Sequence, residues 1–219
     1  MGLADGELIA HRIYAAVRER ILSGAYPPGS VLRQEDIARQ LEVSRVPLRE
    51  VFSKLEAEGF LLSRPRRGYA VVSLEAEEMA EIFDLRSVLE RQAGQIAARK
   101  RSDGDLAALT ELHQEMVAAD ASTPEGRQIW AQANRSFHER ILAIGGRARL
   151  QRIALLLRDQ VEPYVRMEVA LSVDVAEAMQ DHLEIIGALQ AGDAELAGDL
   201  CSAHCRRTER RLLDHLGRE

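Results

Sequence analysis

The chain has 219 residues, 46% of them hydrophobic and 29% charged, which excludes a disordered chain and fits one large globular domain or two modest ones. It has neither an apolar run of about 18 residues nor a basic start followed by an apolar stretch, so we expect a soluble, cytoplasmic protein without a signal peptide or a membrane partner. The net charge is −6, but residues 1–74 carry 11 Lys and Arg against 9 Asp and Glu, whereas residues 75–219 carry 18 against 26. The acidic total therefore does not exclude a nucleic-acid surface in the first part of the chain.

The first third of the chain has the pattern of a helix-turn-helix. Apolar residues recur at helical spacing from Leu8 to Ser23, and the Gly- and Pro-rich stretch 24–29 ends that helix. A short helix is expected over Gln34–Leu41, and after a tight turn another runs from Ser44 to Glu58. The second of two short helices joined in this way is the one that reads DNA.

The start of this reader helix carries residues suited to DNA. Ser44 is a good N-cap, and Pro47 lies in the first turn, where a missing N–H is tolerated. Arg45 and Arg49 are four residues apart, and like charges at this spacing favour an anionic partner opposite them. Arginines beside free backbone N–H groups are suited to bind phosphate and base edges. The alternative is a solvated arginine face on an ordinary amphipathic helix.

Two strand-like runs, at residues 60–63 and 69–72, follow the reader helix. They flank the sequence Arg64-Pro65-Arg66-Arg67-Gly68, which predicts a β-hairpin with a basic tip. Such a wing would reach the groove next to the one that the reader helix occupies.

Residues 8–72 resemble the winged helix-turn-helix domain of the GntR family of bacterial transcription regulators. The motif is long and correctly spaced: Pro28-Gly29 with Leu32, Ile37-Ala38, Leu41, Val43-Ser44-Arg45, Pro47-Leu48-Arg49-Glu50, Leu55, Glu58-Gly59 and Arg67-Gly68. The resemblance implies that operator DNA is contacted by Ser44, Arg45 and Arg49, and in the minor groove by Arg67 and Gly68. On charge and position alone, phosphate contacts are expected from Arg33 and Arg66. Val46 departs from the family, which commonly has Thr there, and this puts the operator sequence in doubt.

Strand patterns stop near Ser73, and six helical segments follow. They are expected at residues 75–100, 103–120, 123–144, 147–167, 174–191 and 194–215. The predicted fold is therefore mainly α. A winged helix-turn-helix domain of residues 1–74, with a small β-hairpin wing, precedes an all-α six-helix bundle of residues 75–219, and a short hinge joins them.

Three histidines lie on three different helices of the predicted bundle. Asn134 and His138 are four residues apart on one helix face, while His182 and His204 lie on the last two helices. Three imidazoles and an amide oxygen from packed helices are able to enclose a divalent ion. By spacing alone the signal is weak, because scattered histidines are usually surface or core residues with satisfied hydrogen bonds.

Residues 75–215 resemble the FCD domain, the ligand-sensing domain of the FadR subfamily of GntR regulators, and six helices suit its VanR-like branch. The matching motifs are Leu85-Arg86 with Leu89-Glu90, Asn134-Arg135-Ser136-Phe137-His138, His182 with Ile185-Ile186 and Ala188-Leu189, and Asp193, Ala197 and His204. The resemblance implies a divalent metal, zinc first with nickel or manganese as alternatives, that is held by His138, His182 and His204 and faces a pocket for a small carboxylate. Asn134 stands where the family has a metal-binding Asp. A neutral amide should weaken cation binding and leave the site more positive toward an anionic effector.

Arg86 occupies the Arg position of the family's Arg-x-x-Leu-Glu pattern and is predicted to bind the effector carboxylate through its planar guanidinium. A buried ion pair between Arg86 and Glu90 is the equally weighted alternative. Trp130, one turn before Asn134, is expected to pack in the core, with a place in the pocket wall as its second role.

Other residues near the site are expected to have no direct part in it. Arg135 should face away from the metal ligands, and His113 and His215 should lie on the surface. Cys201 and Cys205 bracket His204, and we expect them to be small buried fillers, with a Cys–His metal or redox site as the alternative.

Two functions of different classes remain. The favoured one is a homodimeric transcription regulator, not an enzyme, that binds double-stranded operator DNA and responds to a small organic acid. The alternative is a metal-dependent hydrolase centred on the three histidines and fused to a DNA-binding module. The sequence offers no evident general base beside the histidines, no nucleophile elbow and no phosphate-binding Gly-rich loop, which disfavours the alternative.

Overall fold

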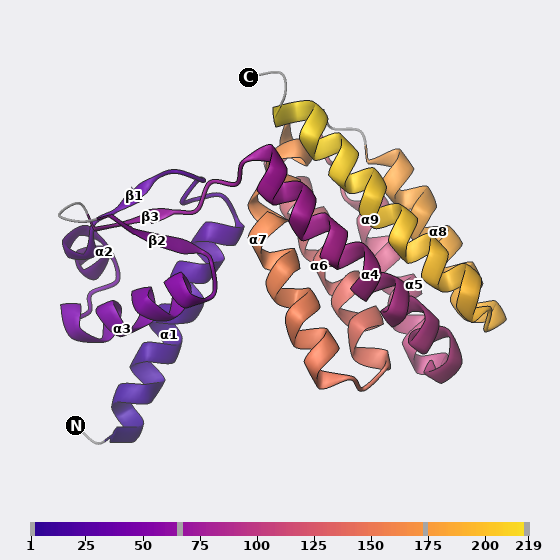
Figure 1. The fold of residues 1–219 in the computed structure, drawn as a ribbon, viewed down its shortest axis with the longest axis horizontal. Helices are drawn as coiled ribbons and strands as arrows, with labels where there is room; N and C mark the ends of the chain where they lie inside the picture. Colours follow the sequence, from indigo (N-terminus) through magenta and orange to yellow (C-terminus); the bar gives the residue numbers. More distant parts are fainter. Residues whose placement is uncertain (1–2, 65–67, 173–174, 217–219) are drawn as a thin grey trace. The chain divides into compact units, whose positions relative to one another are not determined.

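The computed structural model describes residues 3–64, 68–172 and 175–216. The chain divides into two compact units, Met1–Glu75 and Ala76–Glu219 (Figure 1). We call them unit 1 and unit 2 and describe each by itself. The mainly helical fold that the sequence predicts is confirmed.

Unit 1 consists of three helices and a small sheet. Its elements in chain order are α1 (Leu3–Leu22), β1 (Val31–Leu32), α2 (Gln34–Gln40), α3 (Arg45–Ala57), β2 (Leu61–Arg64) and β3 (Gly68–Val71). The strand order is β1-β3-β2, and both pairings are antiparallel. The sequence predicts only the hairpin of β2 and β3, so β1, which pairs Leu32 with Tyr69, is an addition.

The reader helix α3 is anchored by its apolar face. The side chains of Leu48, Val51, Phe52 and Leu55 are at most 3% exposed, as their spacing predicts. The Tyr14 hydroxyl of α1 donates a hydrogen bond of 2.6 Å to Glu58 at the end of α3. These contacts fix α3 on one side and leave its other side to solvent.

Unit 2 is a bundle of long helices. They are α4 (Ala76–Lys100), α5 (Asp103–Ala118), α6 (Pro124–Ile144), α7 (Ala148–Ser172), α8 (Ala176–Ala191) and α9 (Ala194–Leu216). Ser102 caps α5 by accepting from the Asp105 N–H at 3.2 Å, and Thr123 caps α6 by accepting from the Gly126 N–H at 3.0 Å. α7 extends past the predicted end at Met167 and contains Pro163.

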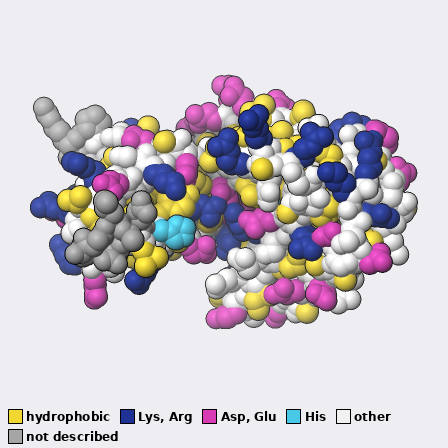
Figure 2. Space-filling model, turned by 90° about the horizontal axis from the view of Figure 1, so that it is seen from below, with side chains coloured by type: hydrophobic (Ala, Val, Ile, Leu, Met, Phe, Trp, Pro, Cys, Tyr) yellow, Lys and Arg dark blue, Asp and Glu magenta, His cyan; other side chains and the backbone are white. Residues whose placement is uncertain are grey.

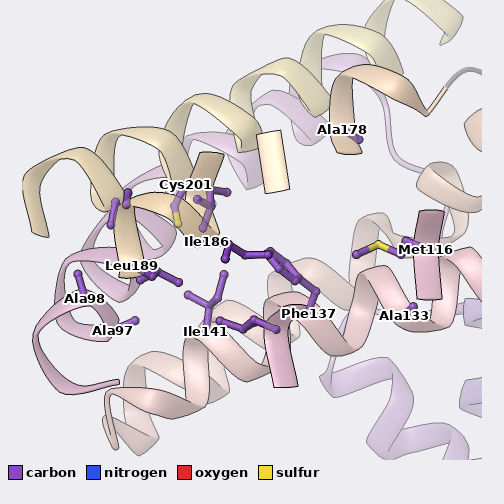
Figure 3. Packing of buried hydrophobic residues seen from close by; sticks show 14 of the residues in the cluster. Ala97, Ala98, Met116, Ala133, Phe137, Ile141, Ala178, Ile186, Leu189 and Cys201 are labelled. Carbon is purple, nitrogen blue, oxygen red and sulfur yellow. The ribbon is translucent and has the colours of Figure 1, made fainter. Parts of the chain in front are cut away.

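The core of unit 2 draws buried side chains from all six of its helices. Figure 3 shows Phe137 and Ile141 of α6 among Ile186 and Leu189 of α8, and all four side chains are buried. At the edge of this core, α4 and α9 approach closely at Gly94, where an added Cβ would lie 2.7 Å from the Ala197 carbonyl oxygen. A larger residue at position 94 would therefore force the two helices apart.

In the part of the chain that the structure describes, every helix is too short or too polar to cross a membrane.

Candidate functional site

Three helices of unit 2 bring His138, His182 and His204 together. His138 comes from α6, His182 from α8 and His204 from α9. One ring nitrogen of each lies within 4.8 Å of the others, and all three side chains are buried. The sequence separates these residues by 22 to 66 positions, so only the packing of the bundle places them side by side.

The His204 ring is held by a carboxylate that the sequence analysis did not single out. Nδ1 of His204 lies 2.9 Å from Oδ2 of Asp181 on α8. Arg207 donates to both oxygens of the same carboxylate, at 2.8 and 2.6 Å. A hydrogen bond from Nδ1–H to Asp181 leaves the lone pair of Nε2 for a metal, which is the usual arrangement around metal-binding histidines.

The surroundings favour neutral imidazoles. Burial lowers the pKa of His138 well below its ordinary value, and the positive charge of Arg158 lowers it further. Burial likewise lowers the pKa of His182. For His204, burial lowers the pKa more than Asp181 raises it. Neutral imidazoles have the lone pairs that metal binding requires.

The donor set fits a divalent cation. Both ring nitrogens of His182 are buried, and neither has a hydrogen-bond partner in the described part of the chain. Buried polar groups without partners are costly, and a metal ion would satisfy one of these nitrogens. Asn134, one helical turn before His138, is 6% exposed and lines the adjoining recess. Its role as a neutral fourth donor stays a prediction from the sequence.

A recess opens beside the histidines within unit 2. Its residues come from α4, α6, α7, α8 and α9, and include Arg86, Trp130, Asn134, His138, Arg158, Val161, Glu162, Val165, Glu168, Ala178, His204, Thr208 and Arg211. Its volume is about 20 Å³, which is the room of roughly one water molecule. The recess is thus lined by arginines, carboxylates and one indole, and it is nearly closed.

Arg86 forms the buried ion pair that the sequence analysis gave as one alternative, while its binding of an effector carboxylate stays a prediction. It lines the recess, and its guanidinium also donates two hydrogen bonds to Oε1 of Glu90, from Nε at 3.0 Å and from Nη2 at 2.8 Å. Arg158 of α7 donates to the same carboxylate from Nη1, at 3.1 and 3.2 Å. All three side chains are buried, and the carboxylate of Glu90 binds both guanidinium groups directly.

Arg158 is a second residue near the histidines that the sequence analysis did not single out. Burial lowers its pKa, and Glu90 offsets this only in part. For Arg86 burial is again the largest single influence, but its acidic neighbours, Glu90 first and then Glu162, help to outweigh it, and the pKa is raised. The less compensated arginine is therefore Arg158, and an anion in the recess would stabilise it. A helical pattern does not reveal which arginine of a long helix faces inward.

The remaining predictions near the site have mixed outcomes. Trp130 is buried and also lines the recess. Arg135 bonds Glu139 at 2.8 Å and Asp159 at 2.6 Å rather than facing the histidines. The prediction of a surface position is wrong for His113, which is half-buried with its Nδ1 atom fully enclosed, because α5 packs against α8. The side chain of His215 lies outside the described residues.

Both cysteines are buried and unpaired. Burial raises the pKa of the Cys205 thiol to about 12 and also raises that of Cys201. A protonated thiol is neither a good nucleophile nor a good metal ligand. Cys201 lies against the close approach of α4 and α9 at Gly94, as a small filler would.

Four of the predicted DNA-contacting residues are exposed in unit 1. Ser44, Arg45 and Arg49 are exposed at the start of α3, and Arg33 is exposed just before α2. Ser44 is the N-cap of α3, but its side chain makes no capping hydrogen bond within the described residues. Figure 2 shows Lys and Arg side chains over the N-terminal unit, at the left of the view, interspersed with acidic ones.

Arg45 and Gly68, two of the predicted DNA-contacting residues, also make contacts within unit 1. Arg45 donates a hydrogen bond of 2.8 Å to Glu35 of α2, and both side chains are exposed. Gly68 has a φ of +92°, and a Cβ there would lie 2.9 Å from the Leu32 carbonyl oxygen. The fold therefore requires glycine at this position, whether or not it contacts DNA. The predictions for Arg66 and Arg67 fall outside the described residues.

Comparisons with known proteins cover both units. The model of the FCD domain matches residues 81–207, and the model described as bacterial regulatory proteins, gntR family, matches residues 9–71. A probable D-xylose utilization operon transcriptional repressor of Paenarthrobacter nicotinovorans is 29% identical over 199 residues, which cover 90% of this chain and 85% of that protein. The transcriptional repressor GlaR of Escherichia coli is also 29% identical over 199 residues, with coverage of 87% and 90%.

Solved structures show the same fold. Escherichia coli McbR/YncC has a TM-score of 0.83 and 22% identity, covering 94% of this chain and 98% of that chain. A putative GntR regulator from Rhodococcus sp. RHA1 has a TM-score of 0.78 at 22% identity, covering 94% and 97%. At this level of identity the likeness concerns the arrangement of the helices alone.

Proposed function

Because the chain belongs to the GntR family of bacterial regulatory proteins and carries an FCD domain, we propose that a small carboxylate bound in unit 2 controls the affinity of unit 1 for operator DNA. The chain is a DNA-binding transcription regulator and not an enzyme, as its named relatives are regulators. The hydrolase alternative is set aside on this ground. We assign DNA binding to residues 1–74 and effector binding and dimerisation to residues 75–219, and place the protein in the cytoplasm, where operator DNA lies.

We propose that His138, His182 and His204 hold a divalent metal, zinc in the first place, with Asn134 as a neutral neighbour. When bound, the metal would supply positive charge beside the recess that His138 and His204 line. Arg158 and Arg86 add two guanidinium groups whose charge Glu90 only half compensates. A carboxylate would be attracted by all three.

The small size of the recess suggests how binding of an acid in unit 2 is coupled to the DNA affinity of unit 1. The recess has room for about one water molecule, so binding of an organic acid requires the surrounding side chains or helices to move. Arg158 joins α7 to α4 through Glu90, and an acid that competes for Arg158 would loosen this contact. The binding energy thereby shifts unit 2 between two arrangements, and DNA affinity changes by the coupling free energy.

We propose that two chains pair through unit 2. Leu85 and Val88 of α4 are 58% and 68% exposed, and they lie three residues apart on one helix face. Apolar side chains grouped in this way favour a second apolar surface, and a second copy supplies one by symmetry. Two reader helices related by a twofold axis would match a palindromic operator.

The observation that carries the proposal is the convergence of three buried histidines beside a recess lined by Arg86 and Arg158. The test is the variant His182→Ala, with His11→Ala, an exposed residue of α1, as its control. Metal content is measured by mass spectrometry. DNA mobility is followed on an operator selected from random duplexes, with acetate, lactate, citrate and gluconate as candidate effectors.

We expect His182→Ala to lose metal and most of the response to acid, while it retains DNA binding without acid. The His11→Ala variant should behave like the natural chain. A His182→Ala protein that responds fully to an acid in the absence of metal would contradict the proposed metal. A natural chain that binds no duplex in a salt-sensitive way would contradict the whole proposal.

A further inference from the structure

Val46 is an apolar side chain that the reader helix presents to solvent. It is the second residue of α3 and is 67% exposed. Apart from the small Ala57, the other exposed side chains of this helix are charged or polar: Arg45, Arg49, Glu50, Ser53 and Lys54. A single exposed valine is ordinary on a protein surface, so its meaning depends on where on the helix it lies.

Val46 lies on the side of α3 that is turned away from the core of unit 1. Leu55, which is fully buried, comes nine residues later, and at about 3.6 residues per turn this is roughly two and a half turns. The two side chains therefore point in opposite directions, and Val46 occupies the middle of the outward face. Packing within unit 1 does not account for a valine at this position.

The first turn of α3 already contains groups that suit the phosphates of DNA. The N–H groups at the start of a helix have no partner within it and attract anions. The hydroxyl of Ser44 makes no capping hydrogen bond within the described residues, and the side chains of Arg45 and Arg49 are exposed. Val46 has neither a donor nor an acceptor in its side chain, so it is unsuited to phosphate. Because the first residues of a reader helix face base edges, a base edge is what its side chain would meet.

The base edges of the major groove differ in how well they suit an apolar side chain. Thymine presents its C5-methyl group there, whereas adenine, guanine and cytosine present hydrogen-bond donors and acceptors. An isopropyl group placed against donors and acceptors removes water from them without replacing its hydrogen bonds, which costs free energy. Against a thymine methyl group, the same contact removes apolar surface from water on both sides and is favourable.

Resting on the assignment of α3 as the reader helix, we propose that Val46 reads a thymine in each half of the operator through the C5-methyl group of that base. Ser44, Arg45 and Arg49 keep the roles assigned to them above. Val46 then selects a T·A pair at one position of each half-site, and the second copy makes the same contact in the other half of a palindromic operator.

The test removes the methyl group from the DNA and shortens the side chain of the protein. An operator is selected from random duplexes, and each thymine is replaced in turn by deoxyuracil in both half-sites. Deoxyuracil pairs with adenine as thymine does and lacks only the C5-methyl group. Binding by the full chain is measured by fluorescence anisotropy at one salt concentration. The variant is Val46→Ala, which introduces a good helix former, and its matched control is Val31→Ala, at a 54% exposed valine of β1.

At one thymine position, deoxyuracil should weaken binding of the natural chain about fourfold for each half-site, as expected for one buried methyl group. Val46→Ala should bind the unmodified operator more weakly and should lose most of this sensitivity, because the side chain and the methyl group form one contact. Val31→Ala should respond to deoxyuracil like the natural chain. Both variants should keep the melting temperature of the natural chain, since both side chains are exposed.

Failure of this proposal is distinguishable from failure of the DNA-binding assignment. The role of Val46 is overturned, and DNA binding stands, if an operator is bound but no deoxyuracil replacement weakens binding, or if Val46→Ala keeps the full methyl effect. The deoxyuracil series on the natural chain decides the first point even where a variant is unstable. If no duplex is selected and binding is insensitive to salt, the assignment of α3 as the reader is overturned as well.

Discussion

Oδ2 of Asp181 lies 2.9 Å from Nδ1 of His204, and the same carboxylate binds Arg207 through two further hydrogen bonds. Asp181 immediately precedes His182, so one turn of α8 supplies both a histidine of the cluster and the group that orients another. The negative charge nearest to the cluster is therefore hydrogen-bonded to His204, whereas the neighbouring Asn134 is neutral.

Replacing Asp181 should weaken metal binding without removing any histidine. In Asp181→Asn the carboxylate charge is lost, and His204 loses the acceptor that orients its ring. Changes of this kind typically lower metal affinity by about 10- to 100-fold. Competition with a chromophoric chelator measures the affinity. The matched control is Asp199→Asn, an exposed carboxylate of the same helix bundle that pairs with Arg91, and equal zinc affinity in both variants would refute the role of Asp181.

Restoring a carboxylate at position 134 should change the balance between metal and anion. Asn134→Asp adds a negative charge beside the three histidines, so we expect zinc to bind roughly tenfold more tightly or better. The same charge should weaken binding of an acid such as gluconate, measured by calorimetry on the zinc-loaded protein. Asn134→Ala serves as the control for loss of the amide alone. A gain in affinity for both metal and acid would contradict the electrostatic argument.

Removing the arginine of the reader helix should abolish specific DNA binding. The side chain of Arg49 is exposed on α3, outside the buried face that Leu48 and Phe52 form. Arg49→Ala should therefore leave the melting temperature unchanged. Fluorescence anisotropy over a range of salt concentrations should show affinity reduced to the non-specific level and a shallower salt dependence. Arg12→Ala, an exposed change on α1, is the control. Undiminished operator binding by Arg49→Ala would disprove the assignment of α3 as the reader.

Removing the shared carboxylate should destabilise the bundle. In Glu90→Gln the buried guanidinium groups of Arg86 and Arg158 lose their counter-charge, which should lower the free energy of unfolding by about 3–5 kcal/mol. Glu139→Gln, at a more exposed pair with Arg135, should cost less than about 1 kcal/mol. Denaturant unfolding at pH 7 measures both, and a Glu90→Gln protein as stable as the natural chain would show that the pair is not compensated through Glu90.

The free energy of unfolding that Glu90→Gln loses should decrease as the pH falls. Burial alone would raise the pKa of Glu90, but Arg86 and Arg158 outweigh it and hold the pKa below the ordinary value of 4.5. A carboxylate with a depressed pKa contributes stability that is complete above the unfolded-state pKa and disappears as pH falls through the folded-state pKa. The difference in stability between the natural chain and Glu90→Gln should therefore shrink as the pH falls below 4.5.

The sequence by itself determined the elements of this protein and the kind of chemistry it contains. Helix periodicity, the caps at Ser102 and Thr123, and the turn at residues 24–29 are local signals, because they depend on residues a few positions apart. The reader helix and its buried face were predictable for the same reason. The family motifs placed the three histidines on separate helices, again from local patterns.

Only the tertiary structure decided which side chains meet. β1 has two residues and pairs with a strand almost 40 residues later, so local patterning does not reveal it. The helices that carry Asp181 and Arg158 have one side toward the core and one toward solvent. How α7, α8 and α9 pack decides on which side each of these two side chains lies. The indole N–H of Trp130 is buried by distant segments and has no hydrogen-bond partner within the described residues, which only the three-dimensional neighbours decide.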